Sequence, residues 1–180
     1  MSREIWVAAN RRIIFFGLVP PTALLAISVW MCLIAGSSTW QLRVGVLVAS
    51  ASIVAIALLV RASVRPRVAY CAGHVEFYLR SAAPIAVPLE YVEAFFLGQG
   101  SAPLPASVNV QVETVTLVAR LSRRAEEWSH VEVHPTLARW CDGYITIRGM
   151  WCEPLTIKLV ETVNRRLHEV KQELFAENRR

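Results

Sequence analysis

Two long segments near the N-terminus contain no charged residue. Residues 13–35 carry none, and residues 44–60 carry none between Arg43 and Arg61. A helix rises about 1.5 Å per residue and the hydrocarbon core of a bilayer is about 30 Å thick, so roughly 20 residues cross it. The first segment is long enough, and the second reaches the minimum with flanking arginines that can extend to the membrane surface. We therefore predict a membrane hairpin in residues 1–67, with spans over 13–35 and 44–60, followed by a soluble domain in residues 68–180.

Negative charge is also nearly absent from the first 67 residues. They hold seven arginines and one acid, Glu4, for a net charge of +6, whereas residues 68–180 hold twelve basic and thirteen acidic residues, for a net charge of −1. A soluble part without a basic excess argues against nucleic-acid binding. Arginine-rich membrane flanks stay on the cytoplasmic side. We therefore expect a multi-pass inner-membrane protein with both termini in the cytoplasm, its topology set by Arg3, Arg11, Arg12, Arg61, Arg65 and Arg67.

Familiar catalytic and cofactor motifs are missing as well. The sequence has no GxSxG, P-loop, GxGxxG or HExxH motif, and its four cysteines form no CxxC pair. This pattern favours a non-enzymatic protein without a cofactor. Scattered cysteines are typical of a reducing compartment, in which disulfides are rare.

Beyond residue 67 the hydrophobic pattern becomes alternating and then helical. Alternation predicts seven short strands, and spacings of three and four predict an amphipathic helix from Pro154 onward. The expected fold is α+β: an antiparallel sheet or barrel capped by a C-terminal helix. The predicted strands cover residues 68–71, 74–80, 85–87, 91–97, 108–121, 128–134 and 144–148.

The order of these features resembles small bacterial membrane proteins with two N-terminal transmembrane helices and a pleckstrin-homology-like (PH-like) domain. The resemblance rests on the hairpin, the strand pair around Ala72-Gly73, the phrase Val87-Pro88-Leu89-Glu90-Tyr91-Val92, and the closing strand and helix. It departs from the family pattern between Ser122 and Trp151, which is longer here. The resemblance implies a curved seven-stranded sheet plugged by the helix on the cytoplasmic face, and it implies no enzyme activity.

Two groups of residues are candidate sites. His130, Glu132 and His134 alternate along a predicted strand, so they share one face and offer metal ligands that Cys141 or Cys152 could complete. The simpler interpretation makes the trio the solvent face of that strand, because the usual zinc spacings are missing. Loop tryptophans can form protein-binding hot spots, or they can pack over a barrel end. On the first interpretation, partner-binding residues are Trp140, Trp151 and Glu153.

The sequence therefore predicts a membrane-anchored scaffold or interaction protein that presents a PH-like domain to a protein partner. One alternative is a lipid-headgroup-sensing or membrane-organising protein, although the near-neutral soluble part weighs against it. A metal-dependent enzyme built on His130 and His134 is the least favoured interpretation.

Overall fold

The chain forms two compact units in a computed structural model that describes residues 3–34, 39–80, 83–101 and 113–177. One unit is residues 10–65, and the other combines residues 1–9 with residues 66–180. The first nine residues therefore group with the β-rich unit, which differs from the expected division at residue 67. The reason is a short N-terminal strand that pairs with the chain after the hairpin.

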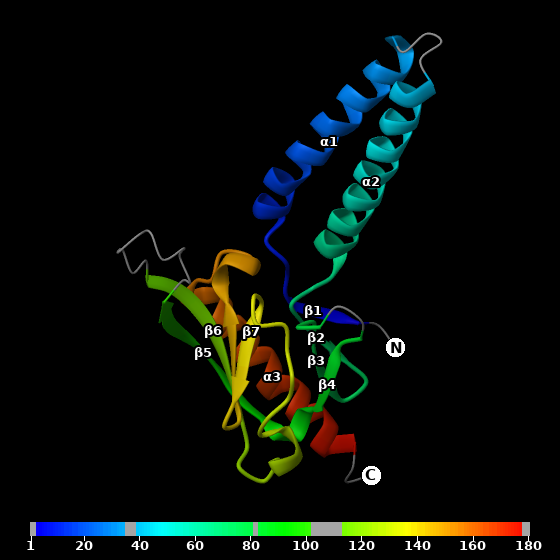
Figure 1. The fold of residues 1–180 in the computed structure, drawn as a ribbon. Helices are drawn as coiled ribbons and strands as arrows, with labels where there is room; N and C mark the ends of the chain where they lie inside the picture. The colour runs from blue at the N-terminus through cyan, green and yellow to red at the C-terminus, as the bar shows by residue number, and fades with distance from the viewer. Residues whose placement is uncertain (1–2, 35–38, 81–82, 102–112, 178–180) are drawn as a thin grey trace. The chain divides into compact units, whose positions relative to one another are not determined.

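The hairpin unit consists of two helices, α1 (Arg11–Ile34) and α2 (Thr39–Val64). Both are long and apolar enough to cross a membrane, and few of their side chains are buried. The two predicted spans are confirmed to that extent. The second helix is longer than expected, because it continues past Arg43 at one end and Arg61 at the other. Figure 1 shows the two helices running antiparallel.

Close packing between α1 and α2 depends on a small residue. Gly45 is buried, and a Cβ atom added there would lie 2.6 Å from Cys32 Sγ and 3.4 Å from the Ser28 carbonyl oxygen. Ser28 is also buried and donates its hydroxyl to the Leu24 carbonyl at 2.6 Å, within its own helix. Small residues let two helix backbones approach closely.

The first sheet of the β-rich unit has four antiparallel strands in the order β1-β2-β3-β4. They are β1 (Glu4–Val7), β2 (Val68–Cys71), β3 (His74–Phe77) and β4 (Ile85–Pro88). The predicted turn at Ala72-Gly73 is confirmed, and both residues have positive φ. Strand β1 was not predicted, because its four residues precede the hairpin and are too few to show a pattern.

The second sheet also has four antiparallel strands, in the order β5-β6-β8-β7. They are β5 (Val92–Ser101), β6 (Glu113–Leu121), β7 (Ala138–Cys141) and β8 (Tyr144–Arg148), and a 3-10 turn, η1 (Leu89–Tyr91), links β4 to β5. The α+β class is confirmed. The expected single sheet or barrel is wrong, because these strands form two separate sheets (Figure 1).

Two further predictions need correction. Residues 128–134 do not form a strand: η2 (Glu126–Trp128) begins the segment, and irregular chain follows. The Ser129 N–H donates to the Glu126 carbonyl at 3.1 Å and the His134 N–H donates to the Leu79 carbonyl at 3.0 Å, while Val131 and Val133 still pack against the core. Strand β7 lies in the predicted connection 135–143. The phase slip in the alternation of residues 108–121 also predicts a β-bulge between 112 and 115, which begins outside the described residues.

Helix α3 (Ile157–Glu177) covers the core, as its apolar stripe predicts (Figure 1). Its contact with the edge of β5 is partly polar. The Asn164 side chain accepts from the Phe95 N–H and donates to the Phe95 carbonyl, both at 2.8 Å. Lys171 Nζ donates to the Val92 carbonyl at 2.6 Å. These bonds satisfy backbone groups that an edge strand otherwise leaves open. Among the described residues, the largest fully buried side chains are Phe77, Phe95, Leu79, Leu89, Leu117, Ile145 and Ile147.

Candidate functional site

One short segment after β8 contacts the chain on both sides of the hairpin. It consists of the 3-10 turn η3 (Gly149–Trp151) and the two residues Cys152 and Glu153, and we call it the junction segment. Gly149 passes so close to the Val115 carbonyl of β6 that a Cβ atom has no space there. Glycine at this position thus lets the junction segment pack directly on the second sheet.

The junction segment binds the chain that leads into α1. The Ala8 N–H donates to Glu153 Oε1 at 2.7 Å, and the Glu153 N–H donates to the Ala8 carbonyl at 3.0 Å. The next residues, Ala9 and Cys152, form an antiparallel β-bridge. The Glu153 carboxylate is a charged acceptor, and charge-assisted hydrogen bonds of this kind are stronger than neutral ones.

The same segment binds the chain that leaves α2. Arg67 is 7% exposed, and its Nε donates to the Trp151 carbonyl at 3.0 Å. Its backbone N–H donates to the Val7 carbonyl at 2.8 Å, and its own carbonyl accepts from the Tyr78 N–H at 3.0 Å. Burial lowers the pKa of Arg67. Arginine nevertheless stays protonated at physiological pH, so the junction holds a buried positive charge.

Cys152 lies next to this charge but is not reactive. It is 1% exposed, and burial raises the pKa of its thiol to about 12. The thiol donates to the Arg148 carbonyl at 3.8 Å. Because the thiolate is the nucleophile and the metal ligand, Cys152 stays an inert thiol and does not complete a metal site.

The predicted topology residues lie in different surroundings. Arg11, Arg12 and Arg61 are exposed. Arg3 instead forms a 2.9 Å salt bridge with Glu76, and its guanidinium lies 4.4 Å from the centre of the Tyr78 ring. Arg3 and the buried Arg67 therefore each make contacts inside the β-rich unit.

The three predicted partner-binding residues also separate. Trp140 is 6% exposed, packs edge-on against Phe77, and donates its indole N–H to the Trp128 carbonyl at 2.7 Å. It is a core residue, which agrees with the packing interpretation and not with partner binding. Glu153 is engaged with Ala8, as described above. Trp151 remains partly exposed, and its indole N–H donates to the Thr136 carbonyl at 2.8 Å.

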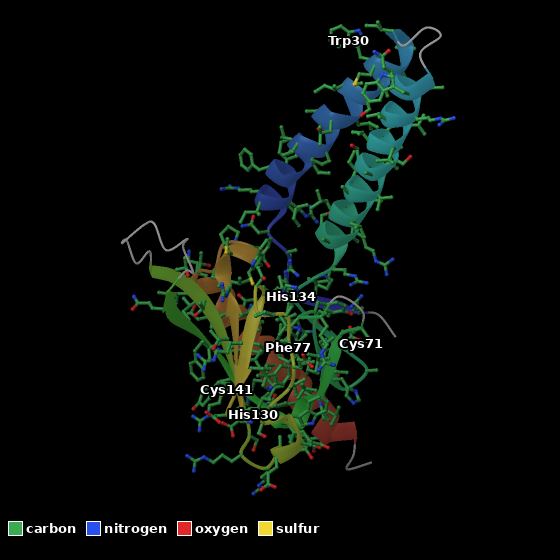
Figure 2. The ribbon with its side chains drawn as sticks, viewed as in Figure 1. Trp30, Cys71, Phe77, His130, His134 and Cys141 are labelled. Carbon is green, nitrogen blue, oxygen red and sulfur yellow. The ribbon has the colours of Figure 1, made fainter. Side chains whose placement is uncertain are left out.

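The predicted metal trio is not brought together on one strand. Figure 2 shows His134 well apart from His130. Within the described residues, His130 gathers with Cys141 and Asp142 instead, without Glu132 or His134. The predicted trio is therefore wrong. Residues 129–134 are irregular chain, and alternate residues of irregular chain need not share a face.

Sequence reasoning missed the contacts that join the N-terminal strand to the rest of its unit. Glu4 forms two 2.8 Å bonds with Arg166 of α3, and Ala8 contacts the junction segment through its main chain. The apolar run Ile5-Trp6-Val7 is too short to signal β1 by itself. No side-chain pattern signals a main-chain contact such as that of Ala8.

Comparisons of this chain with protein-family models, curated proteins and solved structures found no match.

Proposed function

We propose that this protein is a membrane-anchored, non-enzymatic interaction protein whose hairpin holds a PH-like domain at the cytoplasmic face of the inner membrane. The observation that carries the proposal is the junction segment, which binds the chain entering the hairpin and the chain leaving it. A domain joined to the hairpin by both connections is presented to a partner at the membrane.

The two connections between the hairpin and the β-rich unit are short. Ala9 is in a β-bridge and α1 begins at Arg11, so one residue separates them. Two residues separate Val64, the end of α2, from Arg67. At roughly 3.5 Å per residue, tethers of this length reach about 10 Å. Such a tether keeps the domain next to the bilayer and raises its effective concentration toward partners on the same membrane.

Charge supports the proposed orientation. Arg11 and Arg12 begin α1 and Arg61 and Arg65 lie in or just after the last turn of α2, which is the same end of an antiparallel hairpin. Positive charge at one end favours the cytoplasmic side for that end. The PH-like assignment is supported by the two antiparallel sheets and the C-terminal helix packed against them.

Trp151 is the residue we assign to partner contact. Its ring is partly exposed and is held in place by the bond to Thr136, next to Met150, which is 44% exposed. A rigid, amphipathic aromatic side chain beside an apolar neighbour is typical of interface hot spots.

Membrane anchoring is tested in cells. The intact chain should resist carbonate extraction from vesicles, and a protease added outside sealed cells should leave residues 66–177 uncut. Release by carbonate, or cleavage of these residues from outside, would contradict the anchor or its orientation.

Partner recruitment is tested by affinity purification of the full chain in mild detergent, with reciprocal capture by the tagged partner. Trp151→Ala should reduce capture at least tenfold, whereas Tyr144→Ala, an exposed aromatic on β8, should not. Both variants should keep the wild-type far-UV circular dichroism and a cooperative melting transition. If no protein is captured and anionic lipid vesicles raise the melting temperature of the reconstituted chain above that in neutral vesicles, headgroup binding replaces the proposal.

A further inference from the structure

Three side chains that favour transition metals meet at the turn between β7 and β8. His130 Nε2 lies 3.7 Å from Cys141 Sγ and 3.6 Å from Asp142 Oδ1. The Cys141 thiol donates to Asp142 Oδ2 at 3.3 Å. Figure 2 shows His130 and Cys141 side by side, at the end of β7. Imidazole, thiolate and carboxylate are all ligands that zinc takes in proteins.

The fold brings this cluster together from two segments. Cys141 and Asp142 belong to a tight hairpin turn, in which Asp142 has φ 53° and Gly143 has φ 74°. His130 comes from the irregular chain after η2. Two bonds hold that chain against the hairpin: the Gly143 N–H donates to the Ser129 carbonyl at 3.3 Å, and the Trp140 indole donates to the Trp128 carbonyl. The cluster is therefore built into the fold on both sides.

The distances match the edges of a zinc coordination tetrahedron. Zinc binds sulfur at about 2.3 Å and nitrogen or oxygen at about 2.0–2.1 Å. At the tetrahedral angle, these bond lengths place sulfur about 3.6 Å from nitrogen or oxygen, and nitrogen about 3.4 Å from oxygen. The three distances in the cluster agree with these edges to within about 0.3 Å. The two distances to Asp142 involve its two oxygens, and rotation of the carboxylate selects one of them.

We propose that His130, Cys141 and Asp142 bind a zinc ion, with water as the fourth ligand. A thiolate ligand disfavours calcium and magnesium, which prefer oxygen. His130 and Asp142 are exposed, so the side of the ion away from the protein is open to solvent. The ion replaces the proton that the Cys141 thiol now donates to Asp142, and this proton is released to solvent on binding.

The site differs from the one that the sequence predicts. Of the predicted trio only His130 is retained. Cys141, which the sequence offered as a completing ligand, and Asp142 come from the neighbouring hairpin. His134 and Cys71 are consequently matched controls, because each has the chemistry of a ligand but lies outside the cluster.

Cobalt is the first probe, because a tetrahedral cobalt–thiolate site has a characteristic spectrum. The purified full chain, reduced and freed of metal, should bind one equivalent of Co²⁺ with a thiolate-to-cobalt charge-transfer band that added Zn²⁺ abolishes. Zinc should also protect Cys141 from alkylation, but not Cys71, as measured by mass spectrometry. A wild-type chain without the charge-transfer band, or without protection of Cys141, overturns the proposal.

Variants assign the ligands. Cys141→Ser should remove the charge-transfer band, and His130→Gln and Asp142→Asn should each weaken zinc binding at least tenfold, in competition with a chromogenic indicator. Asparagine tolerates the positive φ of residue 142, so Asp142→Asn tests the carboxylate without straining the turn. His134→Gln and Cys71→Ser should bind zinc as the wild type does. Equal losses in the controls, or unchanged binding in all three ligand variants, overturn the proposal.

Discussion

At the scale of single residues, the junction segment depends on side chains that form hydrogen bonds with the backbone of distant segments. Glu153 accepts from the Ala8 N–H, Arg67 donates to the Trp151 carbonyl, and Trp151 donates to the Thr136 carbonyl. Each side chain therefore fixes a piece of main chain rather than another side chain. Glu153 and Trp151 stood out in the sequence as unusual loop residues, but their targets did not, because a carbonyl or N–H group belongs to every residue type.

The Glu153 carboxylate gives a direct test of the junction. Glu153→Ala leaves the partly buried Ala8 N–H without its acceptor, which should lower the free energy of unfolding by about 1–3 kcal/mol. Chemical denaturation of the full chain in detergent, followed by tryptophan fluorescence, measures this loss. Glu132→Ala removes an exposed carboxylate from the neighbouring irregular segment and should change stability by less than about 0.5 kcal/mol. Equal effects of the two variants would contradict the role of Glu153.

At the scale of elements, the β-rich unit is held together by contacts between its first strand and its last helix. The Glu4 carboxylate of β1 forms two bonds with the Arg166 guanidinium of α3, and Arg166 also bonds to Glu169 at 2.6 Å. This pairing places the chain before the hairpin against the chain at the far end of the sequence. Together with the pairing of β1 and β2, it joins residues 1–9 to residues 66–180, although the hairpin lies between them.

The Glu4–Arg166 pair makes stability depend on pH. Arg166 holds the pKa of Glu4 below its ordinary value of 4.5. A carboxyl group whose pKa is lower in the folded chain than in the unfolded chain stabilises the fold at pH values above its unfolded-state pKa. This contribution is lost as the pH falls through the folded-state pKa. The wild type should therefore be more stable than Glu4→Gln at neutral pH, by at most about 1 kcal/mol for a partly exposed pair.

Melting temperatures across the acid range measure this difference. The gap between the wild type and Glu4→Gln should be constant above about pH 5.5 and should close as the pH falls below about 4.5. Glu161→Gln, a change at an exposed acid on α3, should follow the wild type throughout. A gap that widens on acidification would contradict the pairing.

At the scale of the whole molecule, the chain combines an apolar hairpin and a small β-rich unit, each with its own packing. In the hairpin, helices approach through small residues because lipid offers no hydrophobic driving force between them. In the β-rich unit, two sheets and one helix share a core of large apolar side chains.

Gly45 tests whether hairpin packing contributes to the stability of the full chain. Gly45→Leu should lower the melting temperature in detergent, because any Cβ at this position collides with Cys32 Sγ. Gly17→Leu is the matched control, since the nearest atom to its Cβ is Leu59 Cδ2 at an ordinary 3.8 Å. An unchanged melting temperature for Gly45→Leu would show that the α1–α2 contact is dispensable.

The sequence by itself determined the two membrane-length helices, most strands of the β-rich unit and the amphipathic α3, because local hydrophobic periodicity specifies each of them. Only the tertiary structure decided that strand β1 joins the first sheet, that Trp140 enters the core, and that His130 meets Cys141 and Asp142. Each of these outcomes depends on which distant segments come together. Pairing between such segments is set by the packing of the whole core and by backbone hydrogen bonds, and neither has a period that can be read along the chain.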